Sequence, residues 1–567
     1  MATTINTGSV ANFGTKIYVV GAASGIDTSA LIDAAYTQKI APATSIDTQI
    51  EENNSTVSAY TTLQGLGNTM LESLTLLKQT YGYSEAGNSV YDDMTPYLST
   101  SASADPASVV GVTVDSTAKR GNYSIEVKQL AKEMKVTSNA VADKSAALGL
   151  AGTFTLTSEN GTDSEITVTA DMSLEAINAA INAVSGDTNV SSTIVKTGDN
   201  SYTLAITGTK TGETLDYTST GGADIMQSLG ATDAGSNFVN VTQAAQDAIV
   251  FLDGLEITSS SNTIEDVLDG VDFTLYAELP GETINLEVDY DYSATKEAIT
   301  NFVSAYNEFR TFYDQNQNVN STGAVGDDSV LFSDSILDGL NNQIATILAS
   351  SFGDDTDQAT NLGDIGIEFD SGNHLYISDE TKLNDTLLNN YDELREMFQT
   401  SVQTDNASFN VLSNDSTLTD FNLTFDITVD GGGDISGVSV DGNPSLFEFD
   451  GNRIIGAEGT IYEGLSFAYV DDVNASVTVD FKQGMADLLY NSIDTYANAS
   501  SGLIQDTISN IQSTNTSLQT EATRIRERAD AFYSDEVNRY ARMEQEVAAA
   551  EILLATVKAL MGIEDND

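Results

Sequence analysis

The sequence predicts an α+β multidomain protein that has a terminal α-helical coiled-coil leg and mainly antiparallel β head domains. Three observations predict this class. The chain of 567 residues is too long for one hydrophobic core. Apolar residues recur at three- and four-residue steps near both ends, and they alternate with polar residues in between. A hydrophobic content of 40% is enough to bury several cores and argues against disorder.

Helical spacing predicts two or more helices near the N-terminus. Asp27 and Ser29 offer N-cap oxygens to the first helix, and Pro42 is expected to break it. Beyond the break, the apolar stripe is interrupted at Asn53 and then continues with a shift of phase. A stripe this narrow is expected to pack against another helix. The part of it assigned to an assembly interface consists of Leu63, Leu66, Met70, Leu74 and Leu77.

The C-terminal segment has the same spacing from Ile504 onward, with the polar Asn515 at one core position and a slip at Val537. Long helices are therefore expected at both ends of the chain. An ordinary helical bundle within one chain has the same pattern, so the spacing does not name the partner. The residues assigned here to the assembly interface are Ile525, Phe532, Tyr540, Met543, Val547, Leu554, Val557 and Met561.

Between the ends, the hydrophobic period changes from 3.6 residues to two. Apolar and polar residues alternate along 284–290 and 421–429, which predicts half-buried antiparallel strands. Shorter runs of the same kind are bounded by Gly, Asn, Asp and Ser, and they lie at 123–127, 154–156, 202–206 and 477–481. Helices are expected at 174–184 and 296–313.

The charge of the chain excludes several classes of partner. The 84 acidic and 23 basic residues give a formal net charge of −61, of which −52 lies in residues 81–500. Such a surface repels phosphates and anionic headgroups, so no nucleic acid partner is expected. A high-salt habitat would favour the same acidic composition whatever the function of the protein, so the acidity alone does not indicate a function. The longest apolar helical run, 547–561, is broken by Glu551 and Lys558, so no membrane insertion is expected.

The sequence also argues against an enzyme. It has no cysteine, and its one histidine, His374, lies in a turn that leads into a strand. A zinc site with several His ligands and a thiol nucleophile are therefore excluded, and no catalytic residue, cofactor or metal is assigned. Close acidic residues could bind Ca²⁺, but the EF-hand spacing is absent from the one cluster considered. That cluster consists of Asp354, Asp355 and Asp357.

Several motifs, taken in order, resemble the bacterial flagellar filament cap family, the hook-associated cap subunits. Residues 21–27 (GAASGID) are similar to its opening, and residues 121–131 (GNYSIEVKQLA) are similar to one of its strands. Residues 244–271 resemble its series of strands and turns, which contains AQDA, SNTI and GV. Residues 302–307 (FVSAYN) resemble one of its helices, and residues 366–398 fit a later stretch that ends in Phe.

A second group of motifs is shared more widely among flagellar proteins. Residues 152–155, 173–178 and 209–212 are similar to a repeat found in flagellins and hook-associated proteins. This repeat supports a flagellar axial protein without distinguishing its type. No family motif is found from about 402 to 469, so the role of that segment stays open.

The resemblance implies a structural cap at the distal tip of the extracellular filament, which retains exported flagellin and promotes its folding and polymerisation. It implies as partners other copies of the chain in a ring, flagellin, the hook–filament junction proteins, the type III export apparatus and a cytoplasmic export chaperone. A host or surface receptor is a further candidate. Two alternatives remain, a cell-surface adhesin with a helical stalk and β head, and another axial protein such as flagellin or a junction protein.

The expected segments follow from the patterns and the resemblance together. They are a flexible export segment (1–20), an N-terminal helical segment (21–80), a β head domain (81–135 with 240–290), an inserted β head domain with the flagellin-type repeat (136–239), a helix-rich leg domain (291–400), a β-rich insertion of unknown role (401–480) and a C-terminal helical segment (481–567).

Overall fold

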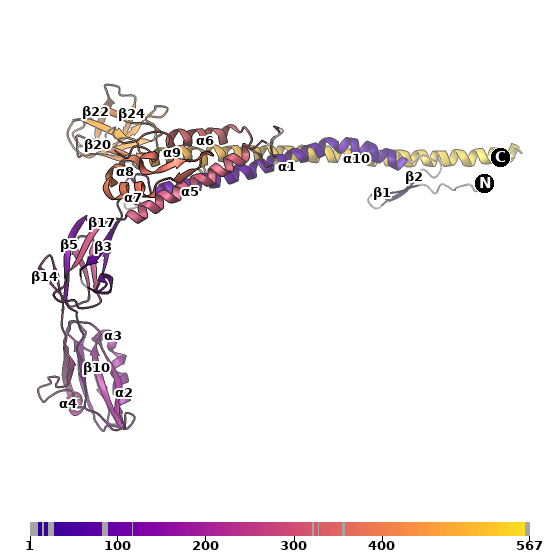
Figure 1. The fold of residues 1–567 in the computed structure, drawn as a ribbon. Coiled ribbons are helices and arrows are strands. Elements are labelled where there is room, and N and C mark those ends of the chain that lie inside the picture. The colour runs from indigo at the N-terminus through magenta and orange to yellow at the C-terminus, as the bar shows by residue number, and fades with distance from the viewer. Residues whose placement is uncertain are drawn as a thin grey trace. The chain divides into compact units, whose positions relative to one another are not determined.

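The computed structural model describes residues 9–13, 16–20, 28–81, 89–101, 103–115, 117–319, 323–326, 328–353 and 358–561. The chain divides into two compact units (Figure 1). Unit 1 contains residues 1–88 and 296–567, and unit 2 contains residues 89–295. Both units combine helices with antiparallel sheets, which confirms the predicted α+β class.

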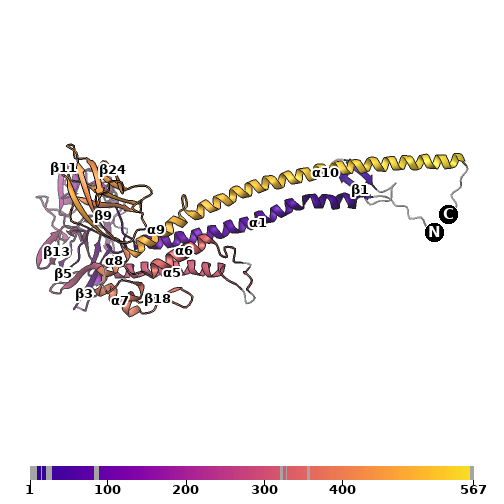
Figure 2. The ribbon, with the colours of Figure 1, turned by 90° about the horizontal axis from the view of Figure 1, so that it is seen from above.

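Two long antiparallel helices dominate unit 1. Helix α1 (Thr28–Thr75) lies beside α10 (Leu503–Met561) along its length (Figures 1 and 2). The predicted break at Pro42 is wrong, because α1 continues through this residue. A proline inside a helix costs about 3 kcal/mol, and packing against α10 offsets this cost, with the neighbouring Ala43 only 1% exposed. The predicted N-cap Asp27 and the whole 21–27 motif lie outside the described residues.

Shorter helices surround the C-terminal half of α1. Helices α9 and α6 pack against each other, and α9 also packs against α1. The predicted helix at 296–313 is confirmed as part of α5. A short hairpin lies close to α5, where the Tyr306 hydroxyl donates to the backbone oxygen of Asn373. These elements are α5 (Tyr292–Asn316), α6 (Ser335–Leu348), η2 (Leu362–Ile365), β18 (Ile367–Phe369), β19 (Leu375–Ile377), α7 (Glu380–Asn389), α8 (Tyr391–Phe398) and α9 (Met485–Ala497). Near the N-terminus, the hairpin β1 (Ser9–Phe13) and β2 (Lys16–Val20) lies beside α10.

The segment between α8 and α9 is a β-sandwich. Its two sheets have the strand orders β20-β27-β22-β23 and β21-β26-β25-β24. Ser401 pairs with Lys482, so the chain enters and leaves this sandwich at one place. Aromatic rings fill its core, for example Phe425 and Phe447 with centroids 4.9 Å apart. The strands are β20 (Ser401–Thr404), β21 (Phe409–Asn414), β22 (Phe421–Val429), β23 (Ile435–Val440), β24 (Phe447–Asp450), β25 (Arg453–Gly456), β26 (Leu465–Tyr469) and β27 (Ala475–Lys482).

Unit 2 contains two hydrophobic cores. The first lies between a sheet with the order β14-β13-β5-β17-β3 and a sheet with the order β15-β16-β4. The alternation predicted for 284–290 is confirmed in β17, where Ile284, Leu286 and Val288 are buried. These elements are β3 (Met94–Thr100), η1 (Pro106–Ser108), β4 (Val110–Val114), β5 (Gly121–Gln129), β13 (Ala248–Leu252), β14 (Leu255–Ser259), β15 (Thr263–Leu268), β16 (Val271–Leu275) and β17 (Ile284–Tyr290).

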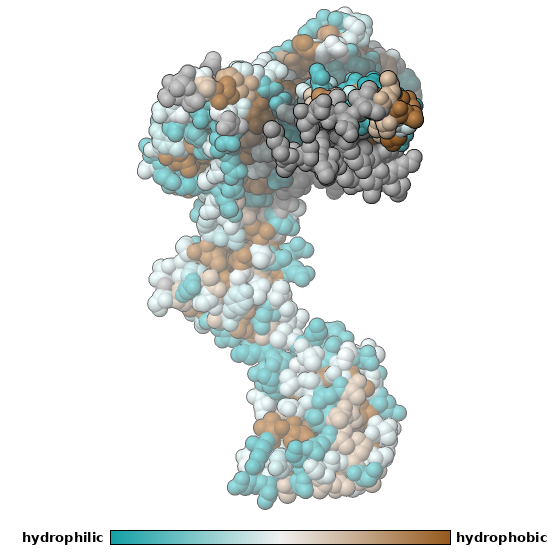
Figure 3. Space-filling view, turned by 90° about the vertical axis from the view of Figure 1, so that its right-hand side faces the viewer, coloured by the Kyte–Doolittle hydropathy of each residue, from teal (hydrophilic) through white to brown (hydrophobic). Residues whose placement is uncertain are grey.

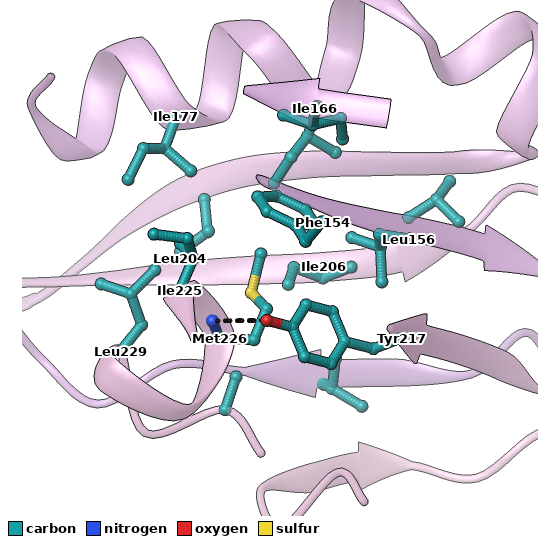
Figure 4. Packing of buried hydrophobic residues seen from close by; sticks show 14 of the residues in the cluster. Phe154, Leu156, Ile166, Ile177, Leu204, Ile206, Tyr217, Ile225, Met226 and Leu229 are labelled. Atoms are coloured by element: carbon teal, nitrogen blue, oxygen red, sulfur yellow. Dashed lines mark hydrogen bonds between the residues drawn. The ribbon is translucent and has the colours of Figure 1, made fainter. Parts of the chain in front are cut away.

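The second core of unit 2 lies between the sheets β12-β6-β10-β9 and β11-β7-β8 (Figure 4). Phe154 and Tyr217 meet at its centre with ring centroids 5.7 Å apart, and the Tyr217 hydroxyl accepts from the backbone N–H of Met226. Burial raises the pKa of Tyr217. The elements are β6 (Lys135–Thr137), β7 (Gly152–Ser158), β8 (Glu165–Val168), α2 (Leu174–Ala183), α3 (Ser185–Thr188), β9 (Val190–Gly198), β10 (Ser201–Gly208), β11 (Leu215–Gly222), α4 (Ile225–Ser228) and β12 (Val241–Gln243).

The surface of the protein is mainly not hydrophobic. Figure 3 shows hydrophilic residues and residues of intermediate hydropathy over most of the coloured face, with apolar residues in separate patches. None of the described helices is long and apolar enough to cross a membrane.

Candidate assembly surface on the terminal helices

Polar side chains fix the register between α1 and α10. At one level, the Asn53 side-chain amide donates to Oδ1 of Asn515 at 2.7 Å, and the Asn515 amide donates to Oδ1 of Asn54 at 2.9 Å. Nearer the start of α1, the Tyr36 hydroxyl donates to Asp530 at 2.8 Å. A sliding movement of either helix would leave these groups without partners, so the antiparallel pairing has one preferred register.

Aromatic and charged contacts surround the start of α1. The Tyr36 and Tyr533 rings meet edge to face with centroids 5.3 Å apart, and the Lys39 ammonium lies 4.4 Å from the Phe532 ring centroid. The hydrogen bond to Asp530 raises the pKa of Tyr36 above its usual value. A salt bridge between Asp47 and Arg526 joins the two helices further along. These contacts hold α1 and α10 together near the N-terminal end of α1.

The N-terminal stripe assigned to the assembly interface lies largely inside the chain. Leu63, Met70, Leu74 and Leu77 are 0% exposed, and Leu66 is half-buried. The same face of α1 includes Gly67, where an added Cβ would lie 2.5 Å from the Cβ of Ala497 in α9. This part of the stripe therefore forms the core between α1 and the neighbouring helices of the same chain.

The C-terminal stripe divides into two parts. Ile525, Phe532, Tyr540, Met543 and Val547 are half-buried. The remaining three assigned residues are exposed: Leu554 to 56%, Val557 to 40% and Met561 to 68%. The structure thus does not bring all thirteen assigned residues together, and the exposed ones gather at the far end of α10.

This exposed end extends beyond the partner helix. Both Figure 1 and Figure 2 show α10 continuing past the start of α1. With a rise of about 1.5 Å per residue, the stretch from Val547 to Met561 is roughly 20 Å long. We call residues 547–561 the apolar overhang.

Three exposed residues of the apolar overhang were not among the predicted interface positions. Ile552, Leu553 and Leu560 are 69%, 65% and 82% exposed. They do not follow the single stripe from which the interface was assigned. The sequence does contain an indication of them, because Ile552, Leu553 and Leu554 are consecutive and therefore lie on more than one side of the helix. Apolar residues on more than one side are typical of a helix with more than one packing partner.

No catalytic arrangement involves the histidine. Nδ1 of His374 lies 3.8 Å from a carboxylate oxygen of Asp370, and Nε2 lies 3.4 Å from the Thr311 hydroxyl. The predicted turn before a strand is confirmed, because β19 begins at the next residue. Within the described residues, no group of three or more His, Asp or Glu side chains could hold a metal ion. The cluster of Asp354, Asp355 and Asp357 lies outside the described residues.

Most of the chain matches two models of one protein family. A family model described as flagellar hook-associated protein 2 C-terminus matches residues 245–551. The corresponding N-terminus model matches residues 24–134. The chain belongs to the flagellar hook-associated protein 2 family. The family match extends through the β-sandwich for which the sequence analysis found no motif.

Hook-associated protein 2 relatives come from several bacteria. The chain is 30% identical over 301 residues to the lateral flagellar hook-associated protein 2 of Vibrio parahaemolyticus, a match that covers 50% of this chain and 64% of the relative. It is 28% identical over 380 residues to flagellar hook-associated protein 2 of Escherichia coli, covering 65% of this chain and 77% of the relative. The crystal structure of the flagellar cap protein FliD D1-D2-D3 domains from E. coli is also similar, at 26% identity with a TM-score of 0.45, over 60% of this chain and 90% of that one.

Proposed function

We propose that the chain caps the distal tip of the extracellular flagellar filament, where it retains exported flagellin and promotes its folding and polymerisation. Membership of the hook-associated protein 2 family supports this function, and a similar E. coli protein is described as the flagellar cap protein. The family also supports a structural role rather than an enzymatic one. The proposed cap contains several copies of the chain, which contact each other and flagellin.

The exposure of the apolar overhang supports a role in assembly. Leu554, Val557 and Met561 remain exposed in the isolated chain, although exposed apolar helix faces are normally covered in an assembly. A helix of this length is marginal in water without a packing partner. We therefore assign the overhang to contacts in the cap, whereas Leu63, Met70, Leu74 and Leu77 stabilise the chain itself.

The test is a double substitution in the overhang, Val547→Asp with Leu554→Asp. Each change places a carboxylate where an apolar contact is proposed, and burial of an unpaired charge costs several kcal/mol. The matched control, Ser513→Asp with Thr520→Asp, adds the same charge at exposed polar positions of the same helix. In a strain that lacks the native gene, we expect the overhang variant to release flagellin into the medium and to make few or short filaments, while the control restores full filaments.

The same experiment separates the cap from the adhesin. An adhesin without a capping role would leave filament length normal and lower only the attachment of cells to surfaces. Filaments of normal length in a strain without the whole gene would refute the cap function. Contacts with hook–filament junction proteins, the type III export apparatus, a cytoplasmic export chaperone and a host or surface receptor belong to the proposal as further partners.

A further inference from the structure

Helix α10 concentrates the arginines of an otherwise acidic protein. Five of the nine arginines lie between positions 524 and 542, although the chain has a net charge of −61. One of them, Arg526, faces α1 and pairs with Asp47. The other four are exposed on α10 and are called the arginine row: Arg524, Arg528, Arg539 and Arg542.

The arginine row occupies one face of the helix. Its members follow each other at steps of four, eleven and three residues, each close to a whole number of turns, so they lie within about 60° of one another around the axis. The buried seam of α10 contains Ala522, Ala529 and Val537, which the same spacing places on roughly the opposite side. The row therefore points away from α1.

In the described part of the chain, one member of the arginine row forms a salt bridge. Arg539 pairs with Glu536 at 2.9 Å. Within the described part of the chain, no carboxylate oxygen lies within 4 Å of the guanidinium groups of Arg524, Arg528 or Arg542. Arg528 and Arg542 donate only to backbone oxygens of the preceding helical turn. Asp535 lies within the row, and the exposed Glu521 and Glu546 lie on the same face about one turn beyond its two ends. The positive excess of this face is therefore small, although the chain as a whole is strongly acidic.

We propose that the arginine row is an electrostatic contact surface for the acidic surface of a second copy of this chain. This inference rests on the proposed cap function. Copies with 84 acidic and 23 basic residues repel each other wherever their acidic surfaces meet, and the row is a place where a neighbouring acidic surface is attracted instead. The same helical face continues into Leu553 and Leu560 of the apolar overhang, 65% and 82% exposed. The arginine row and these apolar residues therefore lie on the same side of α10, with Glu546 between them.

The test compares two charge-matched variants of the full chain. The row variant replaces Arg524, Arg528, Arg539 and Arg542 by Gln. The control variant replaces four exposed cations elsewhere, Lys119, Lys196, Lys210 and Arg453, by Gln. Both have the same net charge, and circular dichroism checks that both remain folded. Self-association of the purified chains is then measured by analytical ultracentrifugation at about 50 mM and about 500 mM salt.

We expect the row variant to self-associate about tenfold more weakly than the control at low salt, because several weak charge contacts are lost together. The difference should shrink to about twofold or less at high salt, where the charges are screened over a few ångströms. An equal loss at both salt concentrations would indicate a structural defect and overturn the proposal. Equal self-association of both variants at low salt would also overturn the proposal. This holds even if the row variant loses binding to purified flagellin, because the partner would then be flagellin and not a second copy of the chain.

Filament assembly in cells distinguishes this inference from the cap function. If the gene deletion shortens filaments and the row variant restores them fully, the cap function stands and the arginine row is not a contact surface. If the deletion leaves filaments normal, the cap function fails first.

Discussion

The carboxyl group of Asp487 should make the stability of unit 1 depend on pH. This residue lies in the first turn of α9 and is 2% exposed. Its Oδ2 accepts the backbone N–H groups of Gln79 at 3.1 Å and of Thr400 at 2.9 Å. Burial outweighs these hydrogen bonds and raises the pKa of Asp487 from 3.8 to about 6.

The direction of the effect follows from the two pKa values. The folded state holds the proton more tightly than the unfolded state, so the stabilisation by the neutral carboxyl is complete below pH 3.8 and is lost as the pH rises through about 6. At about 1.4 kcal/mol for each tenfold change, this loss amounts to about 3 kcal/mol in the free energy of unfolding. Above pH 6, the ionised carboxylate remains buried at this cost.

Substitution Asp487→Asn removes the ionisation and keeps an oxygen for the two N–H groups. We expect the stability of the variant relative to the native chain to rise by about 2 kcal/mol between pH 4 and pH 7. Urea unfolding followed by circular dichroism at 222 nm measures this difference, and Asp385→Asn, at an exposed position of α7, is the control. A difference between variant and native chain that does not change with pH, or that falls as the pH rises, would show that the buried carboxyl of Asp487 does not have a raised pKa.

Three further predictions concern folding and register. Gly67→Leu should destabilise unit 1 by about 1–3 kcal/mol in urea unfolding, because even a Cβ would lie 2.5 Å from the Cβ of Ala497; an unchanged midpoint would contradict this close packing. Asn515→Leu should raise the melting temperature of the leg but broaden the distances between spin labels on α1 and α10, because it removes the amide contacts that select one register; a single sharp distance would contradict that role. A fragment of residues 89–295 should melt cooperatively, since it contains both cores of unit 2; a broad transition without cooperativity would show that it needs the rest of the chain.

Most of the elements that local spacing predicted are present in the structure. The helical stripes became α1 and α10, and the alternating runs became β17 and β22, because a buried face leaves a period of 3.6 or two residues in the sequence. The break expected at Pro42 is wrong because a local rule was applied where long-range packing decides the structure. The pairing of β20 with β27 joins residues about eighty positions apart, and no local pattern encodes such a partner.

The candidate site was predictable only as a set of apolar positions. Met70 and Leu554 each belong to an apolar stripe with three- and four-residue steps, so the sequence pattern does not distinguish them. In the structure, Met70 is 0% exposed and Leu554 is 56% exposed. The difference depends on where α1 begins relative to the end of α10, which is a property of the folded chain. The family resemblance was accessible from short motifs, because turns and tightly packed strands restrict the residues that fit them.

The amides that join α1 and α10 also bear on how the leg transmits force. Asn53, Asn54 and Asn515 form one polar layer in a largely apolar seam. Axial sliding by one residue moves a helix by about 1.5 Å, enough to break both hydrogen bonds of this layer. An axial force must therefore break this layer before α1 and α10 can slide past each other. This layer thus fixes the axial position of α1 relative to α10, and the close approach of Gly67 to Ala497 fixes α1 relative to α9.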